Sequence, residues 1–262
     1  MSAPGSLQTP VILIGASNLT LGWHSLLRQL RSACHGPLDV HVVAGMGRSY
    51  IKPARFAHRL LPAILDCGLW NAVPATEAPP RVLITDVGND LAYGFQPEQI
   101  MESVEACIAR IRAWRADAIS VLTLPPLASL QSLGPARFRA ARTLLFPGSR
   151  LLLPDVLRLA TSLAELLRNA GLRNAMSTIT PPAAWYGLDP IHIRRSSRAT
   201  AFASMFASWG RELAGVSAEP LGGAGLPTWP WLPTPAERRL FRSPRTTPQP
   251  VFSGPDIQIS AW

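Results

Sequence analysis

The sequence predicts an α/β protein, a three-layer α/β/α sandwich built on a parallel sheet. Short runs rich in Val, Ile and Leu recur along the 262-residue chain, and segments with helical spacing of apolar residues lie between them. Continuously apolar strands that alternate with amphipathic helices are typical of parallel sheets covered on both faces. The hydrophobic content of 47% is normal for a globular protein.

The strands are predicted from their apolar runs. Residues 11–15, 40–44, 82–87 and 119–124 are short, rich in aliphatic residues and bounded by Gly, Pro, Asn or Asp. Such runs are typical of buried strands. A weaker candidate lies at residues 174–179.

The helices are predicted from spacings of three and four between apolar residues. This periodicity covers residues 19–34 after the first strand and residues 100–114 after the third. Residues 53–67 and 151–170 have broader apolar faces and are also predicted helices, and a final helix is expected at residues 202–213.

One long connection interrupts this alternation. Residues 125–150 are bracketed by Pro and Gly and exceed an ordinary loop in length. Long insertions in compact domains are often lids or binding loops. A short helix is expected within it, at about residues 135–145.

The predicted domain covers residues 11–215, after an irregular leader at 1–10. Residues 216–262 are rich in proline and have no periodicity, so they are predicted to form a largely irregular tail. Trp229 and Trp231 are the candidate contacts between this tail and the domain.

The charge pattern argues against nucleic acid as a partner. The net charge is +9, and Lys52 is the only lysine among 25 basic residues. A nucleic-acid-binding protein would gather its basic residues in one patch with aromatic side chains positioned to stack on bases. Here the arginines are spread along the polar faces of the predicted helices, and only residues 194–198 and 238–245 form clusters.

Other classes of partner and compartment are also disfavoured. No apolar run reaches the roughly 18 residues that a membrane span needs. The first basic residue is Arg28, so the start lacks the pattern of a secretory signal and a cytoplasmic location is expected.

Cys34, Cys67 and Cys107 form no C-x-x-C pair and are predicted buried thiols. The five scattered histidines predict no metal site, and neither a P-loop nor a dinucleotide fingerprint is present, so no cofactor is expected.

Polar residues follow the predicted strands at one edge of the sheet. Ser17 follows the first strand, Gly47 the second and Asn89 the third, while Asp189 and His192 precede the last helix. In parallel α/β sheets, ligands bind beyond the carboxyl ends of the strands. These residues are therefore expected to face the same rim.

Each of these residues also has a structural interpretation. Ser17 could cap a helix, Gly47 could permit a tight turn, and Asn89 could form an Asx-turn. Together with Asp189 and His192, however, they supply every role that serine-based acyl transfer requires.

The order Ser, Gly, Asn, His, with an Asp three residues before the His, resembles the SGNH (GDSL-type) hydrolase superfamily. The matching stretches are "IGASN", "GMGRS", "VGND" and "DPIH", spread over roughly residues 11–210. The resemblance implies a flavodoxin-like parallel sheet. It also implies Ser17 as nucleophile, His192 as general base and Asp189 as the residue that orients the imidazole.

The same resemblance implies an oxyanion hole made by the backbone N–H groups of Ser17 and Gly47 and by the side-chain amide of Asn89. Two positions depart from the family pattern. Ala16 stands where an Asp is usual, and Val87 stands where a Gly is usual.

Four neighbours of the predicted site complete the candidate set. Asp86 is an extra carboxylate at a strand end, where it can hydrogen-bond the loop. Trp185, Tyr186 and Arg48 flank the site and are candidates for substrate binding.

These observations predict an esterase or acetyl-ester hydrolase that acts on a small-molecule or carbohydrate-linked acyl ester. A catalytically inactive protein of the same fold that binds a ligand or partner is the alternative. A third hypothesis is a basic adaptor that works through its tail. The α/β-hydrolase plan is disfavoured because the sequence has no Gly-x-Ser-x-Gly stretch.

Overall fold

The computed structural model describes residues 8–34, 36–73, 76–209, 232–241 and 243–262. Seven strands form its central sheet: β1 (Thr9–Ile14), β2 (Leu38–Val43), β5 (Arg81–Ile84), β6 (Ile119–Thr123), β7 (Ser177–Ile179), β10 (Phe252–Ser253) and β11 (Ile257–Ala261). Their order is β10-β11-β2-β1-β5-β6-β7. All neighbours are parallel except β10 and β11. The five strands predicted from apolar runs are confirmed, and β1 begins inside the predicted leader.

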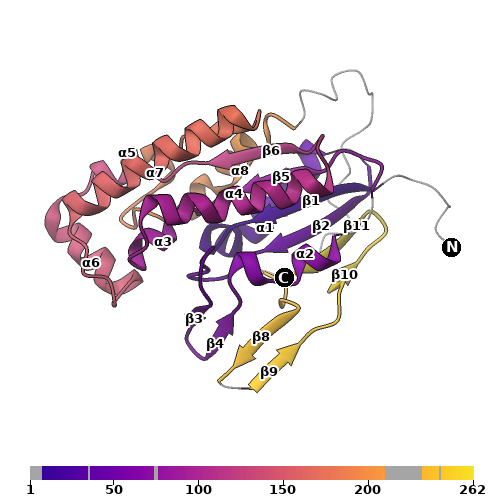
Figure 1. The fold of residues 1–262 in the computed structure, drawn as a ribbon, viewed down its shortest axis with the longest axis horizontal. Coiled ribbons are helices and arrows are strands. Elements are labelled where there is room, and N and C mark those ends of the chain that lie inside the picture. Colours follow the sequence, from indigo (N-terminus) through magenta and orange to yellow (C-terminus); the bar gives the residue numbers. More distant parts are fainter. Residues whose placement is uncertain (1–7, 35, 74–75, 210–231, 242) are drawn as a thin grey trace.

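Two helical layers cover the sheet (Figure 1). The helices α4 (Pro97–Trp114) and α7 (Leu153–Arg173) pack on one face, and α1 (Ser17–Ala33) and α8 (Arg198–Phe206) pack on the other. Successive side chains of a strand point to opposite faces. Accordingly, Ile12 and Ile14 belong to the core under α4 and α7, whereas Val11 and Leu13 belong to the core under α1 and α8. The predicted three-layer α/β/α sandwich is confirmed.

The helix predicted at residues 53–67 is wrong. This segment forms the antiparallel strands β3 (Ala54–Phe56) and β4 (Arg59–Leu61), then a 3-10 turn η1 (Ile64–Asp66). Ala57 takes a left-handed φ of 53° in the turn. The edge of β4 pairs with β8 (Glu237–Leu240), so a partner far along the chain overrides the local helical pattern.

The irregular tail predicted at 216–262 also differs from the structure, in its described part. β8 and β9 (Ser243–Thr246) join β3 and β4 in a four-stranded sheet of order β3-β4-β8-β9. β11 joins the central sheet parallel to β2, and its Ile257, Ile259 and Ala261 enter the core. Proline is tolerated in β9 because that strand lies at an edge. Trp229 and Trp231 lie outside the described residues.

The long connection between β6 and α7 carries the predicted helix. It contains α5 (Leu127–Gln131) and α6 (Pro135–Leu145), which confirms the helix expected at 135–145. Both pack against α7, as does α3 (Asn89–Ala92), and α6 lies at the left-hand edge of the molecule in Figure 1.

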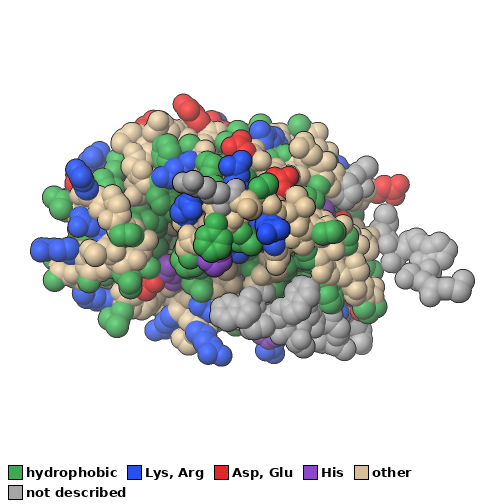
Figure 2. All heavy atoms as spheres, turned by 90° about the horizontal axis from the view of Figure 1, so that it is seen from below, with side chains coloured by type: hydrophobic (Ala, Val, Ile, Leu, Met, Phe, Trp, Pro, Cys, Tyr) green, Lys and Arg blue, Asp and Glu red, His purple; other side chains and the backbone are tan. Residues whose placement is uncertain are grey.

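The remaining short elements are α2 (Leu69–Ala72) and the 3-10 turns η2 (Ala183–Trp185) and η3 (Arg195–Ser197). The three cysteines are buried and free, as predicted. None of the helices in the described ranges is both long and apolar enough to cross a bilayer. Lys and Arg side chains are scattered over the face shown in Figure 2.

Candidate active site

Ser17 opens helix α1 at the carboxyl end of β1, and one carboxylate holds the backbone on both sides of it. The N–H groups of Ala16 and Asn18 both donate to Oδ2 of Asp86, at 2.8 and 3.0 Å. Asp86 follows β5 and takes a left-handed φ of 59°. The loop that carries Ser17 is therefore anchored to the neighbouring strand end, as expected of Asp86.

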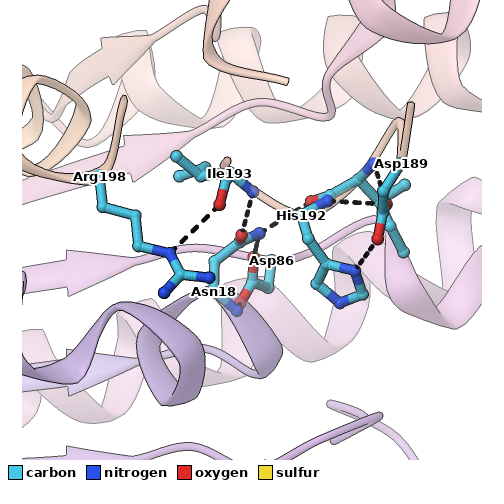
Figure 3. Close-up of polar contacts among 7 residues, drawn as sticks. Asn18, Asp86, Asp189, His192, Ile193 and Arg198 are labelled. Carbon is cyan, nitrogen blue, oxygen red and sulfur yellow. Dashed lines mark hydrogen bonds and ion pairs between the residues drawn. The ribbon is translucent and has the colours of Figure 1, made fainter. Parts of the chain in front are cut away.

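Asn18 connects this serine loop to the segment that carries His192 (Figure 3). Its Nδ2 donates to Oδ1 of Asp86 at 2.6 Å and to the carbonyl of Ile191 at 3.0 Å. Its Oδ1 accepts the N–H of Ile193 at 2.8 Å. We call Asn18, Asp86 and their contacts the Asn18–Asp86 clamp. The sequence gives no signal for it beyond an amide beside the serine, because its partners lie far along the chain.

His192 and Asp189 form a short pair in the loop before η3. The distance between His192 Nδ1 and Asp189 Oδ2 is 2.6 Å, and Asp189 Oδ1 accepts the N–H groups of Ile191 and His192, both at 3.1 Å. Burial alone would raise the pKa of Asp189. The hydrogen bonds and charge of His192, with the two N–H groups, outweigh it and lower that pKa below 3.8. A charged Asp189 requires the proton on Nδ1, which leaves Nε2 of His192 as an acceptor.

Four of the predicted residues line one cavity of about 350 Å³, which we call the serine cavity. They are Ser17, Gly47, Asn89 and His192. No hydrogen bond joins the Ser17 hydroxyl to His192 in the described part of the chain. Catalytic hydrogen bonds are often long before substrate binds, so this separation is compatible with a nucleophile and its base.

Gly47 has a backbone that only glycine adopts easily. Its φ is +65°, and an added Cβ would lie 2.9 Å from the hydroxyl of Tyr93. That hydroxyl donates to the Gly47 carbonyl at 2.5 Å. The turn is thus held at the edge of the serine cavity, where its N–H groups approach a ligand closely.

Asp90 stabilises the same turn through two hydrogen bonds to its carboxylate. Its carboxylate accepts a hydrogen bond from the Ser49 hydroxyl and another from the Tyr50 N–H at 3.0 Å. Burial raises the pKa of Asp90 to about 6, although these two hydrogen bonds lower it. The Tyr50 hydroxyl in turn donates to the Thr85 carbonyl at 2.7 Å, which ties the turn to β5.

The three predicted substrate-binding residues lie away from the serine cavity. Arg48 is fully buried, and its Nη1 donates to the carbonyls of Ala44 and Trp262. Burial lowers the pKa of Arg48 to about 10. The prediction for Arg48 is wrong because its side chain turns inward to bind the end of β11. Trp185 packs in the core under α1 and α8, and Tyr186 lines a separate, apolar cavity.

Comparisons with known proteins agree with this architecture. No family model matches the sequence, and no curated protein matches it. The fold is similar to that of a carbohydrate acetylesterase family member from Sinorhizobium meliloti, with a TM-score of 0.52 and 16% identity over 80% of this chain and 100% of that one. It is also similar to a carbohydrate esterase family 2 enzyme with a carbohydrate binding domain from Corynascus thermopiles (TM-score 0.51, 14% identity, 79% and 68% covered). A psychrotrophic esterase from Pseudoalteromonas sp. has a TM-score of 0.47 at 13% identity, over 78% of this chain and 98% of that one.

The fold expected from the SGNH resemblance is therefore confirmed. The mostly parallel sheet with helices on both faces matches the first two of these structures. At such low identity the likeness describes the fold. The activity has to be argued from the residues of the site.

Proposed function

We propose that this protein is a serine hydrolase that cleaves carboxylic esters. The observation that carries the proposal is the short pair of His192 and Asp189 at the wall of the cavity that Ser17 lines. Gly47 and Asn89 line the same cavity, so hydrogen-bond donors are available beside the nucleophile. The fold of the carbohydrate esterases named above is consistent with this chemistry.

In the first half of the reaction, the Ser17 hydroxyl attacks the carbonyl carbon of the ester. Nε2 of His192 takes the serine proton, and Asp189 stabilises the imidazolium that forms. The N–H groups of Ser17 and Gly47 and the amide of Asn89 donate to the oxyanion. Such donors stabilise charge that develops only in the transition state.

The first half ends when the bond to the alcohol breaks, His192 gives its proton to the leaving alcohol and the acyl group stays on Ser17. In the second half, water attacks the acyl carbonyl while Nε2 of His192 takes its proton. The bond between the acyl carbon and Ser17 Oγ then breaks, His192 returns the proton to Ser17, and the acid is released. The Asn18–Asp86 clamp has a positioning role in both halves, since it joins the loop of the nucleophile to the loop of the base.

The proposed substrate is a small-molecule or carbohydrate-linked ester. We include carbohydrate-linked esters because the fold is similar to that of two carbohydrate esterases. The clamp also suggests how a site with Ala16 stays ordered. Asp86 supplies, from a neighbouring strand, a carboxylate that binds the Ala16 and Asn18 N–H groups.

A fluorophosphonate probe tests the nucleophile. We expect the probe to label Ser17, as located by peptide mapping, and Ser17→Ala to abolish both labelling and p-nitrophenyl ester hydrolysis. Ser32→Ala is the matched control, because Ser32 lies exposed at the far end of the same helix. Absence of labelling in the folded protein would instead favour a protein of this fold that binds a ligand or partner without catalysis.

A further inference from the structure

A second cavity lies beside the serine cavity, and the proposed function gives it no role. It encloses about 110 Å³, less than a third of the volume of the serine cavity. An apolar cavity of about 150 Å³ admits the six carbons of a benzene-sized ligand, which is about 25 Å³ per carbon. At that packing this second cavity holds a hydrocarbon group of about four carbons. We call it the apolar cavity.

The lining of the apolar cavity is mostly hydrophobic. It is built by the long connection, α7 and α8, through Leu130, Phe138, Leu145, Val156, Ala160 and Met205. The charged side chains in its wall are Asp86 and Arg142, and both have partners. Asp86 binds the serine loop, and Nη1 of Arg142 donates to the Leu151 carbonyl at 2.9 Å. A ligand in this cavity therefore meets mainly hydrocarbon surface, and both charged side chains in its wall have hydrogen-bond partners within the protein.

The two cavities are neighbours with a common wall. Six residues line both: Asn89, Ala92, Leu145, Phe146, Ser149 and Ile191. Asn89 is the proposed oxyanion donor, and Ile191 directly precedes His192. A carbonyl held at Asn89 therefore lies at the boundary between the polar serine cavity and the apolar cavity.

We propose that the apolar cavity binds the acyl chain of the substrate, and that the preferred acyl group is a hydrocarbon chain longer than acetyl, from about four to six carbons with the carbonyl carbon included. This inference rests on the proposed function and narrows its substrate. An acetyl methyl group would leave the apolar cavity empty. Burial of each added methylene contributes up to about fourfold in affinity for the transition state.

Helix α6 covers the apolar cavity and offers a way to fill it. Ala141 is half-buried and lines the cavity, whereas its neighbour Ala140 is exposed and lies outside it. Ala141→Phe should occupy the space of the chain, and Ala140→Phe is the matched control on the same helix. Phe138→Ala should enlarge the cavity, because Phe138 is buried in its wall.

The experiment compares kcat/KM for p-nitrophenyl acetate, butanoate, hexanoate and octanoate. We expect the unmodified protein to favour hexanoate over acetate by at least tenfold. Ala141→Phe should remove this preference while acetate turnover stays within about threefold. Ala140→Phe should keep the full profile, and Phe138→Ala should move the optimum to a longer chain. An acetate optimum, or an identical profile in Ala141→Phe, would overturn the inference.

Binding to Ser17→Ala separates this inference from the proposed activity, because it requires no chemistry. By calorimetry, hexanoate should bind Ser17→Ala at least tenfold more tightly than acetate, and the Ala141→Phe substitution should abolish the difference. Equal affinity for the two carboxylates, or no binding of either, would overturn the acyl cavity even in an active enzyme. Preferential hexanoate binding in a protein that hydrolyses no ester would instead contradict the hydrolase proposal and leave the cavity assignment standing.

Discussion

Two His–Asp pairs occur among the described residues, and one of them faces the serine cavity. His192 and Asp189 lie 2.6 Å apart in a loop, with His192 lining the serine cavity. His41 and Asp39 lie 3.2 Å apart on β2, where both side chains are buried. The second pair is a product of strand geometry, because residues two apart on a strand share a face.

The surroundings of the imidazole distinguish the two pairs. His41 has both ring nitrogens engaged, since Nε2 faces Asp39 and Nδ1 accepts the indole N–H of Trp262 at 3.3 Å. The indole also stacks on the imidazole, with an interplanar angle of 5°. No hydrogen bond within the described residues engages Nε2 of His192, and His192 lines the serine cavity. Access to a nucleophile, and not the pair itself, therefore makes an imidazole a candidate base.

The largest expected difference in kcat is the one between the variants His192→Ala and His41→Ala. His192→Ala should lower kcat for ester hydrolysis by about 10⁴-fold or more, because the general base is lost. His41→Ala should leave kcat within about threefold but lower the free energy of unfolding by about 2 kcal/mol, because a buried hydrogen-bonded group is removed. Steady-state kinetics and urea unfolding of both variants measure this. Comparable loss of kcat in both would erase the distinction.

The oxyanion hole is the next most sensitive part. Asn89→Ala should reduce kcat about 10²- to 10³-fold with little change in KM, because the amide donates mainly to the charged transition state. Steady-state kinetics on a p-nitrophenyl ester measure the two constants. A rise in KM at unchanged kcat would show that Asn89 binds the ground state and is no oxyanion donor.

The Asn18–Asp86 clamp should come third. Asn18→Ala removes the side-chain hydrogen bonds to Asp86, Ile191 and Ile193, so the serine loop and the histidine loop lose the amide that joins them. The backbone N–H of residue 18 still donates to Asp86 in the variant. We expect kcat to fall about 10²-fold, the scale of a misplacement of about 1 Å. KM should stay nearly constant. A purely structural role would lower the melting temperature and leave kcat of the remaining folded protein unchanged.

The last prediction leaves the rate of hydrolysis aside and concerns how stability depends on pH, through the buried carboxylate of Asp90. Burial raises the pKa of Asp90 to about 6 from 3.8, so the folded state holds a proton that the unfolded state has released. Asp90 therefore favours folding below about pH 4, and its contribution is lost as pH rises to about 6. Asp90→Asn should remove this slope, on the order of 3 kcal/mol between its ends. Urea unfolding across pH 4 to 7, compared between the protein and the variant, measures it. If the free energy of unfolding changed with pH in the same way in both proteins, the raised pKa would not belong to Asp90.

The sequence predicts those strands and helices whose physical cause lies in the same local stretch of residues. Buried parallel strands are continuously apolar, so β1 and β2 could be found from composition, and the rule for strand ends brings Ser17, Asn89 and His192 to one rim. The hairpin at 54–61 could not be found this way. Its stability comes from pairing with β8, about 180 residues away, and no local property of the segment reports that partner.

Contacts made by single side chains were the least predictable. Arg48 beside a glycine turn was expected to meet substrate, yet it binds the carbonyl of Trp262 inside the protein. Asn18 joins two loops separated by more than 170 positions, and no pattern in its local sequence indicates this role. Both contacts depend on how β11 and the histidine loop approach the centre of the molecule, which neither composition nor periodicity encodes.

The position of β11 affects how the chain folds during synthesis and how it tolerates truncation at its C-terminal end. Until residues 257–261 have been synthesised, β2 has an unpaired edge of backbone N–H and C=O groups. Open edges of this kind invite association between copies. A shortened chain that ends before residue 257 would keep the same exposed edge permanently. Loss of solubility on removing the tail would therefore report a broken sheet rather than a missing adaptor.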